Sequence, residues 1–470
     1  MSAGDGGPLL RVKDLRVYFR IMKGTVKAVD GVSFDLNRGE TMGLVGESGC
    51  GKTTTAFAVT RLLPNNGEIV GGSIRFNNML VGRSYLATEL NEALKRPTWF
   101  EDIQGMLAEG EAALQELQAG IAERQARLAA IQAALVTKEA PPMGAPPGAT
   151  LEAARALESE IEFLEGEAME SNPELSAAVR AIVPPGAVPS PEIQAAIQAV
   201  VDRELKGWSA GRRRRKIERG IERQINTIRW SQISMIFQSA MNAFNPVYRV
   251  GDQIAEALLT HFPGMTKDQA RERVLQLFDL VGIDRSRADG YPHEFSGGMR
   301  QRSMIAMALA CRPQLLIADE PTTALDVIMQ DRILAEIRDL QRELNVAMII
   351  ITHDISVVAE VAEKIGIMYG GKLFEYGNIR EVFDRPGNPY TIGLMSAFPS
   401  IKGDRKRLRA IPGSPPDLAN PPPGCRFHPR CRFAQEICRA QDPPMMEVAP
   451  GHWSLCHFAK EVYEGTMRES

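Results

Sequence analysis

The chain has 470 residues, 44% of them hydrophobic and 24% charged, and its formal net charge is −3. This length exceeds what one hydrophobic core usually supports, so we expect several domains. The balanced charge gives no global bias toward nucleic acid, and no apolar run approaches the roughly 20 residues that span a bilayer. The start, MSAGDGGPLLRVKDLRVYF, lacks a signal-peptide pattern, so we expect a protein of the cytosol, where disulfides are rare.

The first chemical motif is GESGCGKT at residues 46–53, between an apolar stretch that predicts a strand and TTTAFAVTRLL, which predicts a helix. Glycines allow a tight turn that points backbone N–H groups at phosphate oxygens, and the helix N-terminus adds favourable partial charge. Lys52 can reach the β- and γ-phosphates, and the Thr53 hydroxyl can bind Mg²⁺. Cys50 is expected to be a small filler rather than a nucleophile. The predicted ATP-binding residues of this loop are Gly46, Glu47, Ser48, Gly49, Cys50, Gly51, Lys52, Thr53 and Thr54.

A long helical segment is predicted next, within residues 85–229. Apolar residues recur every seventh position from Leu107 to Leu135, which is coiled-coil spacing, and a second 3–4 pattern runs from Leu151 to Leu164. APPMGAPPGAT between them breaks the helix. An antiparallel helical hairpin is the simplest interpretation, and one long helix packed on its own domain is the alternative. The basic run at 212–216 is either a solvated face or a contact with lipid headgroups, membrane subunits or nucleic acid.

A second apolar strand, in PQLLIADEPTTALD, ends at Asp319 and Glu320. Adjacent carboxylates at a strand end are a common arrangement for metal binding and general-base chemistry. Asp319 can hold Mg²⁺ through water, and Glu320 can polarise an attacking water. VAMIIITH predicts another buried strand, which is followed by His353.

Further motifs resemble those of ABC transporter ATPases and follow the order that is usual in that family. HEFSGGMRQR resembles the ABC signature, although Phe295 stands where leucine is commoner, and Ser296 is expected to cap the signature helix. Gln238 in SMIFQSA resembles the Q-loop glutamine, TTALD resembles the D-loop, and His353 resembles the switch histidine that contacts the γ-phosphate.

This resemblance implies an α/β, P-loop (RecA-like) nucleotide-binding domain with a helical signature subdomain. Two such subunits would pack head to tail, with ATP between the P-loop of one and the signature of the other. Phe19 would stack on adenine, with Tyr18 as the alternative. The resemblance implies that Glu320, His353 and Gln238 are catalytic and that Thr53, Gln238 and Asp319 bind Mg²⁺. It also implies that the ATP of the partner subunit is contacted by Ser296, Gly297, Gly298 and Gln301. The D-loop would consist of Ala324, Leu325 and Asp326.

The resemblance is more specific than the ATPase motifs. KAVDGVSFDLNRGETMGLVGESGCGKTT, YPHEFSGGMRQR and NPYTIGLMSAFP, followed by a Pro- and Cys-rich tail, resemble the oligopeptide/dipeptide importer ATPases over roughly residues 9–82 and 230–460. This implies peptide uptake by a peripheral subunit on the cytoplasmic face of the membrane. Its partners would be an identical or paralogous ATPase, two transmembrane permease subunits and an extracytoplasmic solute-binding protein, without nucleic acid. The alternatives are an importer of nickel chelates, sugars or opines, and a soluble ABC ATPase of DNA repair or translation.

Four of the six cysteines stand near the end of the chain with the spacing C-x5-C-x6-C-x17-C: Cys425, Cys431, Cys438 and Cys456. Zinc sites usually use closer pairs, whereas iron–sulfur clusters tolerate ligands from loops. The importer resemblance implies a [4Fe–4S] cluster. Zn²⁺, with His428, His452 or His457 as substitute ligands, is one alternative, and reduced thiols or disulfides are the other.

The expected domains follow from these patterns. Residues 1–84 and 230–384 are expected to form the nucleotide-binding domain, 85–229 an inserted helical coiled-coil region, and 385–470 a small irregular Cys-rich domain. AIPGSPPDLANPPPGC in this last part is too rich in proline to predict regular structure.

Overall fold

The computed structural model describes residues 7–22, 24–83, 86–95, 98–137, 158, 161, 172–184, 187–206, 221, 222, 225–238, 244–321, 327–397 and 411–467. These residues belong to two units, each with its own core. The cassette unit consists of Met1–Gly82 and Ile225–Ser470, and the inserted unit is Arg83–Gln224.

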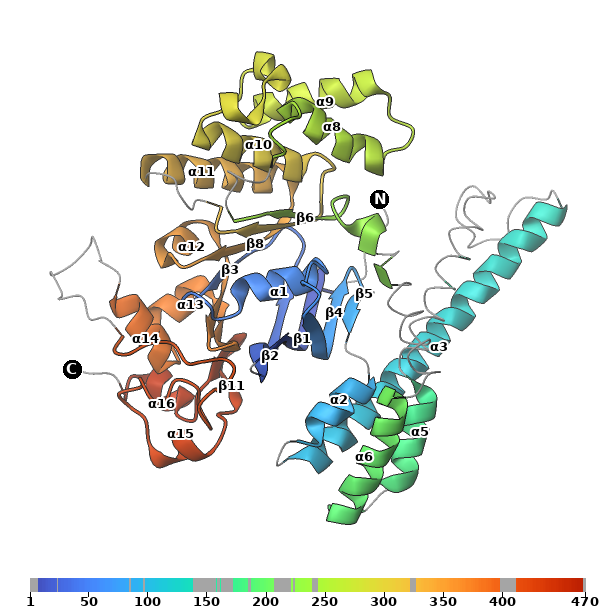
Figure 1. Ribbon diagram of the computed structural model, residues 1–470, viewed down its shortest axis with the longest axis vertical. Coiled ribbons are helices and arrows are strands. Elements are labelled where there is room, and N and C mark those ends of the chain that lie inside the picture. Colours follow the sequence, from blue (N-terminus) through green and yellow to red (C-terminus); the bar gives the residue numbers. More distant parts are fainter. Residues whose placement is uncertain are drawn as a thin grey trace. The chain divides into compact units, whose positions relative to one another are not determined.

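An eight-stranded sheet forms the centre of the cassette unit (Figure 1). Its order is β11-β12-β10-β9-β3-β8-β7-β6, and the strands from β9 to β6 are parallel. These five strands are short, mainly apolar and almost wholly buried, which is typical of strands covered on both faces. The bounds are β3 Thr41–Val45, β6 Ile233–Ile236, β7 Leu315–Asp319, β8 Ala347–Thr352, β9 Lys364–Tyr369, β10 Lys372–Asn378, β11 Met445–Ala449 and β12 His452–Leu455.

The two faces of this sheet carry different layers. Leu315 and Ile317 of β7 lie in one core with α1 (Lys52–Val59). Leu316 and Ala318, which alternate with them, lie in a second core with the helices of the other layer. That layer contains α8 Val250–His261, α9 Lys267–Leu280, α10 Gly297–Leu309 and α11 Val327–Leu344, with short 3-10 turns at Arg285–Asp289 and Pro292–Glu294. Helices α1 and α10 therefore lie on opposite faces of β7.

A four-stranded antiparallel sheet packs into the same core as α1. Its order is β2-β1-β4-β5. Apolar residues such as Val17, Val29 and Ile74 are fully buried there. The bounds are β1 Leu10–Ile21, β2 Gly24–Leu36, β4 Gly67–Phe76 and β5 Met79–Arg83.

The tail is more regular than its composition suggests. Strand β12 pairs with β10 through Glu375↔Ser454 and Tyr376↔Trp453, and β11 pairs with β12. The tail thus adds a hairpin to the central sheet, which was not expected from the sequence. Residues 411–435, which include the proline-rich part and the turn from Cys425 to Cys431, contain no helix or strand. Helices α12 Ile355–Val361 and α13 Ile379–Asp384 precede the tail, and α14 Pro389–Ser396, α15 Glu436–Ala440 and α16 Ala459–Glu464 lie within it.

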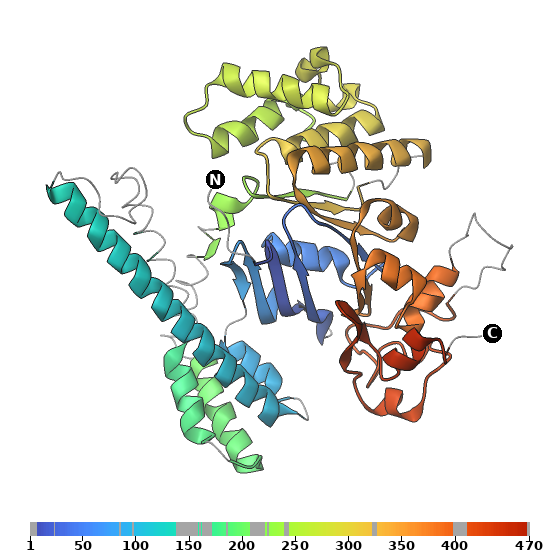
Figure 2. The ribbon, with the colours of Figure 1, turned by 180° about the vertical axis from the view of Figure 1, so that it is seen from behind.

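The inserted unit consists of helices that share a small core of their own. Their bounds are α2 Leu86–Ala93, α3 Trp99–Thr137, α5 Pro173–Ile182 and α6 Pro191–Lys206. Leu90, Ile103, Val179 and Ile197 are each fully buried in that core. Figure 2 shows α3 continuing well beyond α2, α5 and α6.

Helix α3 covers the whole first arm of the predicted hairpin in 39 residues. Its buried and half-buried positions include Leu107, Leu114, Leu117 and Ile131 and follow the predicted 3–4 spacing. The second arm, the break before it and the basic run lie largely outside the described residues, so the hairpin stays a prediction. Helices α2 and α5 were not expected from the sequence.

The end of the inserted unit differs from the expected boundary at residue 229. Ile225 and Ile228 are nearly fully buried in the core of the cassette unit, together with strand residues such as Ile233. The last residues of the range 85–229 therefore belong with the cassette. Among the described residues, no helix combines the length and apolarity needed to cross a bilayer.

Candidate functional site

The carboxyl ends of the parallel strands bring the predicted site together. Strand β3 leads into the P-loop, β7 ends at Asp319, β8 ends just before His353, and β6 ends two residues before Gln238. Parallel strands present these ends at one edge of the sheet, which is where open α/β sheets bind ligands.

The P-loop wraps around the side chain of Lys52. The Lys52 Nζ donates hydrogen bonds to the carbonyl oxygens of Gly46, at 2.8 Å, and Glu47, at 3.0 Å. Gly51 has a φ of 103°, and a Cβ there would lie 2.3 Å from the Ala28 carbonyl oxygen, so only glycine fits. The loop positions Ser48 and Gly49 are exposed, whereas Thr54 is half-buried in α1.

Cys50 occupies the inner side of this loop. Its side chain is buried, and burial raises the pKa of its thiol although Lys52 Nζ lies 3.7 Å from its Sγ. The nucleophile in thiol chemistry is the thiolate, which this environment disfavours. These properties suit a packing role in the loop.

Thr53 and Asp319 form the next contact, across 266 residues of sequence. Thr53 Oγ1 donates to Asp319 Oδ1 at 3.2 Å, and Asp319 is almost fully buried. Burial, with a contribution from the charge of Glu320, raises the pKa of the Asp319 carboxyl to about 6. A hydroxyl and a carboxylate in contact are ligands that Mg²⁺ prefers, and a bound cation favours the ionised carboxylate.

Glu320 is held in an uncommon conformation between two polar side chains. Its φ is 46°, in the left-handed region, and its N–H donates to the Ile351 carbonyl of β8 at 2.8 Å. Its Oε2 accepts from Gln238 Nε2 at 2.6 Å, and its Oε1 lies 3.5 Å from His353 Nδ1. The three residues predicted to be catalytic therefore meet, with the His353 side chain 68% exposed.

The signature residues lie at the start of α10. Ser296 caps this helix by accepting from the Met299 N–H at 3.3 Å, as the sequence predicted. Gly297 and Gly298 form its first turn, and no atom lies within 4 Å of a Cβ built on Gly297. Gln301 is buried, and its side-chain amide donates to the carbonyl of Pro321, just after Glu320.

The expected adenine-stacking position is occupied by two adjacent aromatic residues of β1. Tyr18 is buried, and its hydroxyl donates to Asp30 Oδ1 at 3.0 Å. Phe19 is half-buried beside Gly67 of β4. Phe19 therefore remains the candidate, because Tyr18 is committed to an internal contact. The D-loop residues Ala324, Leu325 and Asp326 lie outside the described residues.

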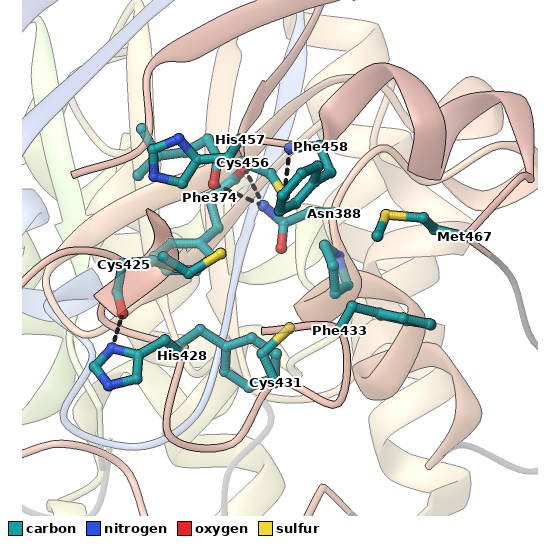
Figure 3. A pocket seen from close by; sticks show the side chains of 14 residues that line it. Phe374, Asn388, Cys425, His428, Cys431, Phe433, Cys456, His457, Phe458 and Met467 are labelled. Carbon is teal, nitrogen blue, oxygen red and sulfur yellow. Dashed lines mark hydrogen bonds between the residues drawn. The ribbon is translucent and has the colours of Figure 1, made fainter. Parts of the chain in front are cut away.

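All four tail cysteines line one pocket (Figure 3). Aromatic and other apolar side chains such as Phe374, Phe427 and Phe458 complete its wall, and its empty volume of about 390 Å³ includes the solvent at its mouth. His428 and His457 also line it. His452 does not: it is fully buried in β12, with Nε2 2.7 Å from Glu375 Oε1. His452 is therefore not available as the substitute ligand that the sequence suggested.

Three of the tail thiols lie in surroundings that disfavour the thiolate. Burial, with a contribution from the neighbouring tail cysteines, raises the pKa of Cys431 to about 11 and that of Cys456 to about 12. Burial also raises the pKa of Cys425. Within the described residues, no group of three or more His, Cys, Asp or Glu side chains is placed to hold a metal ion. None of the four tail cysteines forms a disulfide with another cysteine.

One neighbour of the P-loop was missed from the sequence. Arg430, between two tail cysteines, makes a bidentate ion pair with Glu47 at 2.7 and 2.9 Å. The hydroxyl of Tyr390 in α14 accepts from the Glu47 N–H at 3.3 Å. The ion-pair partners are 383 residues apart, and no local pattern links them.

Comparisons with known proteins agree with this geometry. The family model described as "ABC transporter" matches residues 29–140 and 204–323, and "Oligopeptide/dipeptide transporter, C-terminal region" matches 374–438. The oligopeptide transport ATP-binding protein OppD of Salmonella typhimurium is 36% identical over 450 residues, which cover 95% of this chain and 93% of that protein. The dipeptide transport ATP-binding protein DppD of Lactococcus lactis is 47% identical over 235 residues, which cover 50% of this chain and 67% of that protein.

A solved structure is also similar. The post-hydrolysis dimer of the ATP-binding cassette MJ0796 is 16% identical, with a TM-score of 0.45, over 79% of this chain and 99% of that one. The family models and the near full-length relative, together with the P-loop site, show that this ATPase belongs to the oligopeptide/dipeptide transport ATP-binding proteins of the ABC transporter family.

Proposed function

We propose that this chain powers the import of peptides by hydrolysing ATP in a head-to-tail dimer of ABC cassettes. The observation that carries the proposal is the meeting of Gln238, Glu320 and His353 beside the P-loop, because these residues come from the ends of different strands. A single local motif does not produce such a constellation.

The roles of the site residues follow from their contacts. Lys52 would bind the β- and γ-phosphates, and Thr53 and Asp319 would hold Mg²⁺, which neutralises charge on the phosphates. Glu320 would orient and polarise the attacking water, with its carboxylate fixed by Gln238 on one oxygen and His353 on the other. Hydrolysis then depends mainly on positioning and charge stabilisation.

A dimer is supported by the position of the signature helix. Helices α1 and α10 pack on opposite faces of β7, so the open N-terminus of α10 does not share a sheet face with the helix that begins at Lys52. Ser296 and Gly298 would instead contact the ATP of a second cassette, identical or paralogous. ATP bound between two cassettes then favours the closed pair, and hydrolysis releases it.

The peptide substrate is supported by the names of the relatives, oligopeptide and dipeptide transport proteins. Transport requires two permease subunits and a solute-binding protein, and would place this chain at the cytoplasmic face of the membrane. Val247 and Tyr248, 69% and 59% exposed after the Q-loop, are suited to contact a permease.

The substrate is tested with the assembled transporter in vesicles that enclose ATP. Uptake of labelled di- and oligopeptides should depend on the solute-binding protein, and a matched panel contains a nickel chelate, a sugar and an opine. Uptake of one of these compounds without peptide uptake would contradict the peptide assignment but preserve the ATPase assignment.

The cysteine pocket is proposed to hold a [4Fe–4S] cluster. The four thiols line one largely apolar pocket, and cysteine thiolates are the usual ligands of iron–sulfur clusters. Cys425, Cys431, Cys438 and Cys456 would be the ligands. The cluster would link four positions that are distant in the sequence, one of them in α15, and no step of ATP hydrolysis requires its electrons.

Anaerobic purification tests this assignment. We expect iron and acid-labile sulfide in a ratio near one, with visible absorbance that is lost in Cys425→Ser. A control substitution of Cys311→Ser, a buried cysteine outside the pocket, should leave the absorbance unchanged. Colourless protein with stoichiometric zinc would instead support the zinc alternative.

A further inference from the structure

In the turn from Cys425 to Cys431, the cysteine side chains and the arginine side chains point to different parts of the cassette unit. Its cysteines line the pocket, whereas Arg426 and Arg430 contact the nucleotide-binding part of the cassette unit. The turn is closed by backbone hydrogen bonds from Arg430 and Cys431 to the Phe427 carbonyl, each 2.9 Å long. Cysteine and arginine side chains are therefore fixed by the same short piece of backbone.

Arg430 is bound on all sides. Besides its two bonds to Glu47, its Nη1 donates to the Tyr369 hydroxyl at 3.1 Å and its Nε donates to the Pro412 carbonyl at 2.8 Å. Only 6% of its side chain is exposed, and the hydrogen bonds to Glu47 are the largest cause of its raised pKa. A buried bidentate pair of this kind is both strong and geometrically specific.

Glu47 is the second residue of the P-loop. The pair to Arg430 fixes its side chain, and the Tyr390 hydroxyl engages its backbone N–H. Tyr369 and Tyr390 pack together with ring centroids 4.6 Å apart, and both contact the ring of Phe427 at 5.2 Å. An aromatic cluster shared by the tail and the cassette thus supports the partners of Glu47.

A second connection runs through Arg426. Its guanidinium donates to the carboxylate of Asp30 and to the carbonyl of Gly370. The next residue, Gly371, donates its N–H to the Cys50 carbonyl of the P-loop at 3.1 Å. The cysteine turn is therefore linked to the P-loop at two points, directly at Glu47 and through Gly370 and Gly371 at Cys50.

We propose that Arg430 is a positioning residue for ATP binding: its ion pair with Glu47 holds the P-loop in the conformation that receives phosphates. The pair joins the loop to the cysteine turn, so the order of that turn sets the affinity of the chain for nucleotide. This inference does not depend on the transported substrate or on what the cysteine pocket holds. Arg430 touches no reacting atom, so its effect is on binding rather than on the chemical step.

A double-mutant cycle in the full-length chain tests the proposal. Arg430→Gln, Glu47→Gln and the double variant are titrated with a fluorescent ATP analogue in the presence of Mg²⁺. Each single substitution should raise the dissociation constant for the ATP analogue about three- to tenfold. Because both substitutions break the same ion pair, the dissociation constant of the double variant should be no higher than that of the weaker-binding single variant. In Arg430→Gln the kcat at saturating ATP should change little, and Arg430→Lys, which keeps the charge, should recover part of the affinity.

Hydrogen exchange supplies a readout that is independent of activity. In Arg430→Gln, amides of the P-loop should exchange faster, while those of β7 and β8 keep wild-type protection. The matched control is Arg439→Gln, an exposed arginine of the same tail, which should change neither exchange nor affinity.

Two results would overturn the proposal. One is a folded Arg430→Gln or Glu47→Gln variant that binds ATP as the wild type does. The other is a double variant whose loss of ATP affinity equals the product of the two single losses, because independent effects exclude coupling between the two residues. If Arg430→Gln does not fold, Glu47→Gln alone decides: wild-type affinity in that variant refutes the positioning role.

Discussion

The inserted unit and the Cys-rich tail both extend an ordinary cassette, but they are built in opposite ways. The core of the inserted unit consists only of its own helices, with Leu90, Val179 and Ile197 at its centre. The tail instead shares a core with the cassette, in which Phe427 packs with Val45 and Tyr369. An extension with its own core can be altered separately, whereas an extension that completes a shared core cannot.

The largest expected effect concerns the cassette alone. Glu320→Gln removes the carboxylate that polarises water but keeps a side chain that can still accept a hydrogen bond from Gln238. We expect ATP turnover to fall by about 10²-fold or more while ATP binding persists. Steady-state phosphate release and equilibrium nucleotide binding measure the two quantities. Unchanged turnover would contradict the role given to Glu320.

The tail is predicted to contribute to the free energy of unfolding of the cassette. Phe427→Ala should lower the free energy of unfolding of the cassette by about 3–5 kcal/mol, because a buried ring is lost from the shared core. Chemical denaturation, monitored through the loss of ATP binding, measures this change. Phe262→Ala, at a position 40% exposed, is the control and should cost much less.

The same experiment on the inserted unit should give a local effect. Ile197→Ala should destabilise that unit by about 2–5 kcal/mol, while the midpoint for loss of ATP binding stays unchanged. Leu205→Ala, 38% exposed on the same helix, is the control. A shift of the cassette transition with Ile197→Ala would show that the two cores are not independent.

Removal of the inserted helices should have the smallest effect on the chemistry. Replacing residues 86–222 by a flexible Gly/Ser linker should leave the kcat for ATP within about twofold, because the site and its core belong to the other unit. The deletion must stop before Ile225, which is buried in the cassette core. A loss of transport without a loss of ATPase activity would assign the insertion to coupling or partner contact.

Sequence reasoning succeeded where the physical cause is local. The P-loop, the cap at Ser296 and the strand that ends at Asp319 follow from short motifs and from apolar runs of strand length. Helix α5 also carries a local signal, since Asn172 caps it and Pro173 opens it. Helix α2 is too short for its apolar spacing to be distinctive.

Sequence reasoning could not find contacts that only the folded chain creates. The Arg430–Glu47 pair joins a turn of the tail to the P-loop, and no pattern in the sequence of either segment indicates that they meet. The pairing of β12 with β10 was missed for the same reason, since strands as short as β11 and β12 gain their order from the neighbouring strand. The meeting of Gln238, Glu320 and His353 was expected only from family resemblance.

The pairing of β12 with β10 also bears on how such chains can be shortened or fused. In the full chain β10 has a neighbour on each side, β9 and β12. A chain cut after the cassette motifs would leave one side of β10 with unpaired N–H and C=O groups, which is a template for intermolecular strand addition. Truncated versions should therefore tend to self-associate, and reporter proteins are better attached beyond α16 than in place of the tail.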